Sequence, residues 1–461
     1  MTNLQDPQDS PATPAPQATP APQATPAPQA TQDPPGAEDA PGDPGPAAPP
    51  PGCPAHTDPS SAGPALLYGE RYLRNPAESY ERMRRDHGQV APVLLESDVP
   101  AWLILGYREI RQVVTDVQTY GRDSRRWNRW DEVPSDWPLM PWVAHSPMIH
   151  FTEGDEHRRR SAAVSDALAS VDPFELRRHC ERFADSLIDK FVGSGKADLV
   201  FDYVYSVPAL AMGQMFGLPE DQLEYMAEAV TVSLLSSDEA MAAQQRAAEV
   251  VQRLVAAKRE EPGPDVTSRY IRNSPDLTDE QLVGDLMVMI AAGMPATSYW
   301  IGNTVRLMLT DDRFTMTLAG NRRSIGEAMN EVLWADSPLQ NVIGRFATRD
   351  TTLGDQRIRA GDLLVLGLAA ANADPLLWPD SGAGYAGNNA YVSFTGGDYG
   401  CPVGAPDLGK IISETAIEVL LDRVPDLELA VEPDELQWMD SLWYRCLVSL
   451  PVTFTPAPAA G

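Results

Sequence analysis

The helical pattern from Thr278 to Leu309 is the longest of the chain, and its part from Leu282 onward is mostly apolar around the girth of the helix. A helix without a polar face lies through a core. Further helical periodicity appears in segments on either side of it: Glu70–His87, Tyr107–Thr115, Glu156–Ala169, Pro173–Val192, Leu218–Ser236, Glu239–Glu260, Ser324–Ala335 and Leu408–Asp422. Strand-like runs are few and short: Val90–Leu95, Ala101–Leu105, Arg345–Arg359, Leu363–Leu368, Leu427–Val431 and Val448–Phe454. The sequence therefore predicts a mainly α protein with small β-sheets, an α+β fold.

Pro295 interrupts this central helical pattern, within the segment from Ala291 to Thr297. Proline has no backbone N–H, so it removes one intrahelical hydrogen bond and forces a kink at a cost of about 3 kcal/mol. A break in a central helix often marks a ligand pocket, where a free carbonyl oxygen can meet water or substrate. We expect such a pocket here, and an incidental kink is the alternative.

A single cysteine, Cys401, follows a glycine-rich turn that comes after an apolar strand, in the segment Tyr391–Pro402, and the helical pattern Leu408–Leu421 comes next. The glycines allow the backbone to approach a flat cofactor closely, and a following helix N-terminus favours a thiolate over a thiol. One thiolate bound to an iron porphyrin favours O–O bond cleavage. A buried structural cysteine is the plain alternative.

The first 64 residues cannot belong to a core, because they hold 19 of the 43 prolines, no Lys or Arg, and three tandem copies of Ala-Thr-Pro-Ala-Pro-Gln. Such a composition offers too little apolar area to offset the entropy of ordering. We therefore expect a disordered Pro/Ala-rich tail over 1–64, one large domain over 65–455 and a flexible C-terminus over 456–461.

The net charge of −29 argues against nucleic acid as a partner. The four cysteines lack the spacing of a metal finger and fit a reducing cytoplasm. No secretory signal is recognisable at the N-terminus, and no run of about 18 apolar residues predicts a membrane span. A cytoplasmic location is the resulting expectation.

Several weak segments, taken in order, resemble a bacterial cytochrome P-450 over roughly Leu67 to Phe454. The segments that carry this resemblance are Trp102–Gly106, Glu156–Arg159, Ala292–Gly293, Gly344–Asp350, Ala371–Pro375, the residues Phe394, Gly397 and Cys401, and Leu450–Phe454. The resemblance implies the P-450 fold, with haem b as the cofactor and Cys401 as the axial ligand of its iron. Phe394 and Gly397 then belong to the loop that carries this ligand.

The same resemblance implies partners for the haem propionates, but with departures. His157 and Arg345 stand where such partners are found, whereas Ser161 and Tyr399 replace two basic residues of the family pattern. Arg159 or Arg160 could substitute for the missing cations, since charge-assisted contacts to a carboxylate are strong.

Two further departures concern the central helix and the helix before the ligand loop. The family's acid–alcohol pair, which relays protons, aligns with Pro295-Ala296; Thr297 could supply a hydroxyl, and Gly293 would line the same face, if the helix is locally rewound. In the family's ExxR motif, Trp334 replaces the Arg, so Glu331 would be costly if it is buried without a cation. A Trp there resembles an actinobacterial branch of the superfamily whose members often sit beside small-GTPase signalling genes.

These residues imply a haem-thiolate oxidoreductase of the monooxygenase type. We expect it to act on an apolar or aromatic small molecule, with dioxygen and electrons from a ferredoxin or a similar donor that docks near the basic clusters Arg158–Arg160 and Arg177–Arg178. The alternative is a catalytically impaired haem-binding or interaction protein in a signalling or biosynthetic complex, which the missing Arg and missing acid–alcohol pair would favour.

Overall fold

The computed structural model describes residues 63–233, 240–315, 322–378 and 387–459. The chain divides into two units, Met1–His56 and Thr57–Gly461, and every element described below belongs to the second. The expected tail over 1–64 lies outside the described residues except for its last two, as does part of the expected C-terminal segment. Both boundaries therefore stay predictions.

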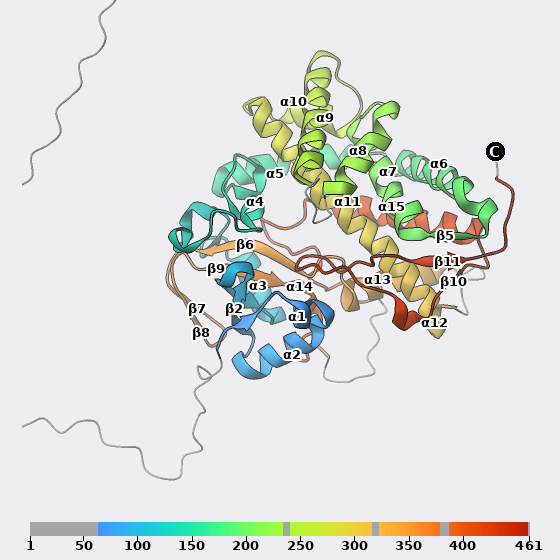
Figure 1. Cartoon of the computed structure of the whole chain (residues 1–461). Coiled ribbons are helices and arrows are strands. Elements are labelled where there is room, and N and C mark those ends of the chain that lie inside the picture. Colours follow the sequence, from blue (N-terminus) through green and yellow to red (C-terminus); the bar gives the residue numbers. More distant parts are fainter. Residues whose placement is uncertain (1–62, 234–239, 316–321, 379–386, 460–461) are drawn as a thin grey trace, which may run out of the picture. The chain divides into compact units, whose positions relative to one another are not determined.

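Helices make up most of the described part, as Figure 1 shows, and the prediction of a mainly α protein is confirmed. The helices are α1 (Glu70–Arg74), α2 (Pro76–His87), α3 (Tyr107–Thr115), α4 (Met140–Val143), α5 (Gly154–Ala169), α6 (Pro173–Phe191), α7 (Ser206–Phe216), α8 (Glu220–Ser233), α9 (Ala240–Glu260), α10 (Val266–Asn273), α11 (Asp279–Thr310), α12 (Asp312–Thr315), α13 (Arg322–Ala335), α14 (Leu368–Asn372) and α15 (Ala405–Arg423).

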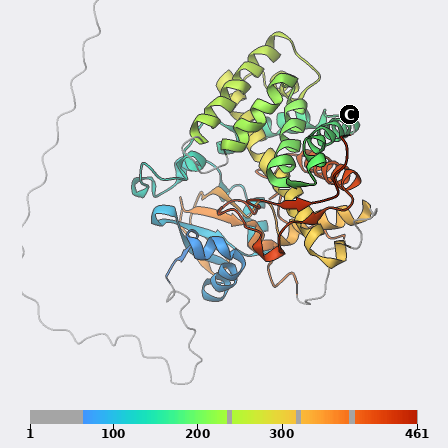
Figure 2. The ribbon, with the colours of Figure 1, turned by 45° about the vertical axis from the view of Figure 1, so that its right-hand side comes forward.

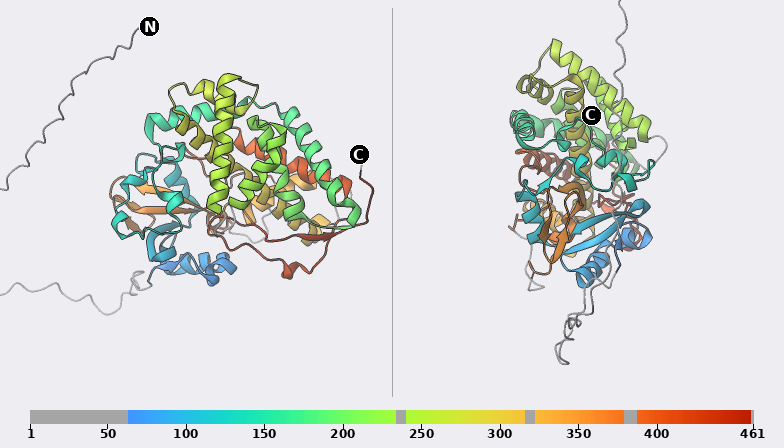
Figure 3. Two further views of the ribbon diagram at one scale, coloured as in Figure 1. Left: turned by 45° about the horizontal axis from the view of Figure 1, so that its top comes forward. Right: turned by 90° about the vertical axis from the view of Figure 1, so that its left-hand side faces the viewer.

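The strands form small sheets, which was also predicted. The largest has the order β1-β2-β3-β9-β6-β4, from Ala65–Leu66, Val90–Leu95, Val99–Ile104, Leu363–Gly367, Asn341–Ala347 and Tyr120–Gly121. A second has the order β10-β11-β5, from Glu428–Leu429, Pro451–Thr453 and Lys196–Asp198, and a hairpin joins β7 (Thr351–Leu353) to β8 (Gln356–Ile358). Strands from distant parts of the chain thus lie side by side, β3 parallel to β9 (Figure 3).

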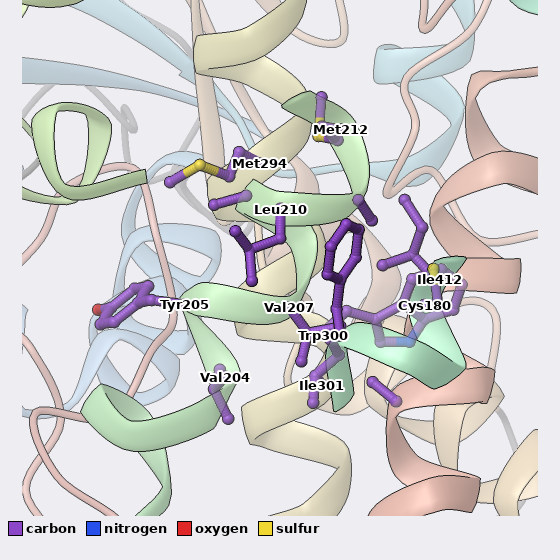
Figure 4. Close-up of a cluster of buried hydrophobic side chains, with 14 of the residues drawn as sticks. Cys180, Val204, Tyr205, Val207, Leu210, Met212, Met294, Trp300, Ile301 and Ile412 are labelled. Carbon is purple, nitrogen blue, oxygen red and sulfur yellow. The ribbon is translucent and has the colours of Figure 1, made fainter. Parts of the chain in front are cut away.

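Helix α11 lies through the helical core and packs against α7, α9, α13 and α15 (Figures 1 and 2). The side chains of Met294, Trp300 and Ile301 on α11 meet Leu210 and Met212 of α7 in one buried cluster (Figure 4). By length and composition alone, α11 could cross a membrane, but 56% of its most apolar stretch is buried inside the protein. It is therefore the core helix that its apolar girth predicted.

Pro295 lies inside α11, which is helical from Asp279 to Thr310 without interruption, so the helix does not end at the proline, and the expected kink stays a prediction. A capping box between Thr278 and Gln281 fixes its start. Past the proline, the hydroxyls of Thr297 and Ser298 donate to the carbonyl oxygens four residues earlier, at 2.7 and 2.9 Å. These side-chain bonds go to the carbonyl oxygens of Gly293 and Met294, and not to that of Ala291, which loses its backbone donor to the proline.

Candidate functional site

The segment before Cys401 is a tight loop whose shape depends on backbone bonds and one glycine. The N–H of Cys401 donates to the carbonyl of Phe394 at 3.2 Å, and the N–H of Gly400 to that of Gly397 at 3.1 Å. Gly397 has φ of 66°, and a Cβ there would lie 1.8 Å from the carbonyl oxygen of Val114 in α3. Only glycine fits this position, so the predicted Gly397 shapes the loop.

The Cys401 side chain is free of disulfide bonds and accessible, yet burial of its surroundings raises the pKa of the thiol to about 11. The expected help from a helix N-terminus is not found, because α15 begins only at Ala405, with Gly404 as its N-cap, and Pro402 precedes it. The protein alone thus keeps this sulfur protonated. A metal ion would displace the proton, since a coordinating thiol is deprotonated outright.

Two arginines converge on the residue two places before this cysteine. Arg345 on β6 is fully buried, and its guanidinium donates to the carbonyl oxygen of Tyr399 at 3.3 Å and lies 5.2 Å from the centre of the Tyr399 ring. Arg122, which follows β4, donates to the same carbonyl oxygen at 3.4 Å. Within the described residues, the Nε atoms of both arginines are buried without a hydrogen-bond partner.

Among the described residues, neither of these two cations forms an ion pair. Burial lowers the pKa of Arg345 well below its usual value, with the charge of Arg122 adding to the effect, and burial lowers the pKa of Arg122 to about 10. A buried cation needs a partner or costs several kcal/mol. Because Arg345 and Arg122 stand next to the Cys401 loop, they fit the carboxylates of a porphyrin. Arg122 was missed from the sequence, where nothing sets it apart from its neighbours Arg125 and Arg126.

His157, a predicted propionate partner, lies beside this pair. Its ring meets the ring of Tyr399 edge-on at 4.8 Å, and its Nε2 lies 2.9 Å from the carbonyl oxygen of Asp398. Burial lowers its pKa, so the neutral imidazole prevails. Both nitrogens of the His157 ring have partners, because Nδ1 lies 3.2 Å from the carbonyl oxygen of Ile149; His157 therefore lies beside the two arginines as a neutral ring, and a contact with the cofactor stays a prediction.

The proposed substitutes Arg159 and Arg160 do not join this cluster. Arg159 is exposed on α5. Arg160 is buried in an ion pair with Asp285 of α11, with its Nε 2.9 Å from the carboxylate, and that carboxylate also accepts from the Tyr270 hydroxyl and the Ile149 N–H. Arg160 thus fixes α5 to α11.

The candidate catalytic residues on α11 point away from its accessible face. Ala292 is exposed, and Val288 and Ala296 are half-buried, so spacings of four place an open apolar face along one side. Thr297 is buried, and its hydroxyl lies 3.5 Å from the place that a Cβ on Gly409 of α15 would take. Because α11 is not rewound, a catalytic role for Thr297 is a prediction that this geometry does not favour.

Gly293, the other candidate, faces α7. A Cβ built on it would lie 2.8 Å from the terminal methyl of Met212. The glycine therefore permits close packing of α11 on α7, and a role in the chemistry stays a prediction.

Glu331 forms an ion pair with an arginine of another helix. Its carboxylate pairs with Arg313 of α12 at 2.6 Å and is 16% exposed, whereas the Arg313 side chain is 62% exposed. Glu331 is therefore not the unpaired buried charge that would have been costly. Trp334, in the place of the Arg, is 3% exposed and donates its indole N–H to the carbonyl oxygen of Asn388 at 2.8 Å.

Groups that could hold a metal ion by several His, Cys, Asp or Glu side chains do not occur among the described residues. Cys401 therefore remains a single-ligand site, which suits an iron held mainly by a macrocycle.

No family model matches the chain. Curated relatives match nearly its whole folded part. The vitamin D(3) 25-hydroxylase of Pseudonocardia autotrophica is 29% identical over 405 residues, covering 85% of this chain and 97% of the relative. Cytochrome P450 107B1 of Saccharopolyspora erythraea is 26% identical over 396 residues, covering 84% and 97%.

Solved structures show the same fold. Testosterone-bound CYP154C4 from Streptomyces sp. ATCC 11861 superimposes with a TM-score of 0.75 at 26% identity, covering 86% of this chain and 99% of that one. The fold predicted from the ordered segments is thereby confirmed.

Proposed function

Because these relatives and structures support membership of the cytochrome P450 family, whose members carry haem b on a cysteine thiolate, we propose that this monooxygenase-type oxidoreductase oxygenates an apolar or aromatic small molecule. Dioxygen and electrons from a ferredoxin or a similar donor complete the reaction. The observation that carries the proposal is that the guanidinium groups of the buried Arg345 and the half-buried Arg122 lie beside the Cys401 loop without an ion-pair partner among the described residues.

The chain's own residues hold the cofactor in this proposal. Cys401 would hold the haem iron through its sulfur, and the haem, once bound, would supply the activation of dioxygen. Arg345 and Arg122 would neutralise and orient the propionates through charge-assisted hydrogen bonds, and the neutral ring of His157 would lie beside them. Burial of these groups keeps water from competing for the carboxylates, so each contact is stronger than it would be at the surface.

The substrate class follows from the accessible face of α11. Val288, Ala292 and Ala296 offer only apolar atoms, and an apolar wall selects substrates by shape and burial rather than by charge. The names of the relatives agree with this class, since one hydroxylates vitamin D(3) and one was solved with testosterone. We expect neutral, largely hydrocarbon substrates.

Proton delivery must use other groups than the acid–alcohol pair. Pro295 and Ala296 cannot donate a proton, and the Thr297 hydroxyl donates to the Gly293 carbonyl oxygen on the side of α15. In this proposal, water ordered at the free carbonyl oxygen of Ala291, which Pro295 leaves without a backbone donor, carries the protons. We expect slow, partly uncoupled turnover as a result.

The docking face proposed for the electron donor is less basic than the sequence indicated. Arg158 pairs with Asp155, Arg177 with Glu418, and Arg178 with Glu175. On α5, an acidic ferredoxin could therefore contact the exposed Arg159 directly. At the other three arginines it would have to compete with the carboxylates that already pair with them. Docking there, a cytoplasmic location and signalling partners all stay part of the proposal.

The interaction-protein alternative is less well supported, because the relatives are hydroxylases and monooxygenases by name and the cation cluster is arranged for a dianion. The deciding experiment is the ferrous–CO spectrum of the full chain reconstituted with haem. A strongly red-shifted thiolate Soret band that is lost in Cys401→Ala supports the proposal, whereas a chain that takes up no haem refutes it.

A further inference from the structure

The last turn of α13 is joined to the Cys401 loop by buried hydrogen bonds between neutral groups. The carbonyl oxygen of Leu333 accepts from the Nδ2 of Asn372 at 2.9 Å and from the hydroxyl of Ser393 at 2.7 Å. Asn372 is 1% exposed and Ser393 6%. Three segments that are distant in sequence therefore meet at one backbone atom.

Asn372 uses both ends of its amide in this arrangement. Its Oδ1 accepts the N–H of Val392 at 2.9 Å, and its Nδ2 also lies 2.9 Å from the Ser393 hydroxyl. Its own carbonyl oxygen accepts the indole N–H of Trp378 at 2.9 Å. A buried amide with its donor and acceptor both used fixes its neighbours in one geometry.

Trp334 holds the beginning of the same loop. Its indole N–H donates to the carbonyl oxygen of Asn388, and its ring meets the rings of Trp378 and Tyr391 edge-on at 5.0 and 5.8 Å. The Tyr391 ring in turn lies 5.9 Å from that of Phe394, whose carbonyl oxygen accepts the Cys401 N–H. A continuous set of ring contacts and hydrogen bonds thus runs from α13 to the sulfur-bearing residue.

We propose that Trp334 and Asn372 are positioning residues that set the backbone of the Cys401 loop, and that they do so without charge. The cluster Leu333, Trp334, Asn372, Trp378, Val392 and Ser393 is called the neutral clamp below. Glu331 plays no part in it, since its carboxylate is engaged by the exposed Arg313. The role of the neutral clamp in cofactor binding rests on the proposed function, but its hydrogen bonds and ring contacts are present in the chain without the cofactor.

A neutral clamp differs from a charged one in a measurable way. Its formation requires no desolvation of an ion pair. Neither added salt nor a change of pH between the pKa values of carboxylates and those of arginines should therefore weaken it. It depends on the N–H groups of two indoles, one hydroxyl and both ends of one amide, and a single substitution removes any one of these side chains.

The test uses two matched tryptophans. Trp334→Phe keeps the ring and removes the N–H that reaches Asn388. Trp137→Phe is the control: Trp137 is 2% exposed and donates to the carbonyl oxygen of Glu96 at 2.8 Å, in a separate core cluster that does not include the loop. Both variants lose one buried hydrogen bond, so a general loss of stability affects them alike.

Two readouts separate positioning from stability. In the haem-loaded chain we expect Trp334→Phe to transfer haem to an excess of apo-globin about tenfold faster than Trp137→Phe, and to show a smaller share of the red-shifted thiolate Soret band with CO. In the chain prepared without haem, we expect faster hydrogen exchange over residues 388–401 in Trp334→Phe alone.

Equal haem loss and equal exchange in the two variants would overturn the neutral clamp. If the parent chain binds no haem, the proposed function fails, and the exchange comparison still decides on the clamp. Should Trp334→Phe not fold, Ser393→Ala removes only one hydroxyl from the same cluster and is scored by the same two readouts. Glu331→Gln should leave both readouts unchanged, and a change as large as that of Trp334→Phe would also overturn the proposal.

Discussion

Arg122 and Arg345 donate to one and the same acceptor, the carbonyl oxygen of Tyr399, at 3.4 and 3.3 Å. Two guanidinium groups that share a neutral acceptor repel each other, and the burial of Arg345 leaves that repulsion poorly screened. Cofactor binding and the stability of the cofactor-free chain therefore make opposite demands on these residues.

The first prediction concerns that conflict. We expect Arg345→Met to stabilise the cofactor-free chain by about 1–4 kcal/mol, because an apolar side chain of similar length replaces an unpaired buried cation. The same substitution should weaken haem binding by at least about tenfold, because a propionate loses its partner. Urea unfolding of the cofactor-free chain and haem titration measure the two effects. Destabilisation of the cofactor-free chain would contradict the argument.

A second prediction concerns the Cys401 thiol before iron binds. With its pKa at about 11, about one thiol in a thousand is ionised at pH 8, roughly a hundredfold fewer than for a thiol with a pKa of 9. We expect alkylation of Cys401 by iodoacetamide in the cofactor-free chain to be slow at pH 8 and to rise tenfold per pH unit up to about 11. Peptide mass spectrometry gives the rate, and fast labelling at pH 7 would contradict the burial argument.

A third prediction compares two glycines. Gly397→Ala places a methyl group against the Val114 carbonyl oxygen in a left-handed conformation, so it should cost about 3 kcal/mol or more and disturb the loop. Gly326→Ala in α13 meets no atom within 4 Å and should stabilise the chain by about 0.5–1 kcal/mol. Thermal unfolding of both variants measures this. The prediction is wrong if both substitutions change the free energy of unfolding in the same direction.

A fourth prediction concerns acid sensitivity. Burial lowers the pKa of His150 to about 3, with the charges of Arg122 and Arg160 adding to the effect, while the unfolded chain has a pKa near 6.5. Between these values the unfolded chain binds more protons, so stability falls as pH falls from 6.5, by up to about 1.4 kcal/mol per unit for this group.

His150→Phe removes this proton and keeps a ring against Phe151, whose centre lies 3.9 Å from that of His150. We expect the variant to lose less stability than the parent between pH 6.5 and 5, by about 2 kcal/mol at most. His157 shifts in the same direction, so some acid sensitivity should remain. Parallel slopes in the two chains would show that His150 is not buried as described.

Periodic patterns predicted the elements well where local chemistry decides them. The helix expected over Thr278–Leu309 is observed as Asp279–Thr310 because Thr278 and Gln281 form a capping box, a signal written within four residues. The hairpin of β2 and β3 around Ser97 likewise follows from alternation and a turn. By contrast, the helix expected over Leu408–Asp422 is observed as Ala405–Arg423. It begins earlier than its apolar pattern because Pro406 suits the first turn and Gly404 is its N-cap.

The site was predictable only in part. Five of the predicted residues lie in one region: Cys401, Gly397, Phe394, Arg345 and His157. They could be named because the order of short segments in the sequence resembles that of a known family. The partner of Glu331 could not be foreseen, because Arg313 is on another helix and nothing in either segment encodes the meeting. The direction of the Thr297 side chain could not be foreseen either. Thr297 is one residue after Ala296, and one residue turns a helical side chain by about 100°, here from the open face of α11 toward α15.

The contact between Thr297 and Gly409 has a mechanical consequence. A Cβ built on Gly409 would lie 3.5 Å from the Thr297 hydroxyl, in ordinary van der Waals contact, so α11 and α15 pack closely at this point. A molecule that displaces the middle of α11 must therefore also displace the helix that begins four residues after Cys401. If Cys401 holds haem as proposed, a substrate that pushes against α11 would in this way also shift the helix next to the residue that carries the cofactor, and the binding of substrate and the binding of haem would be energetically coupled.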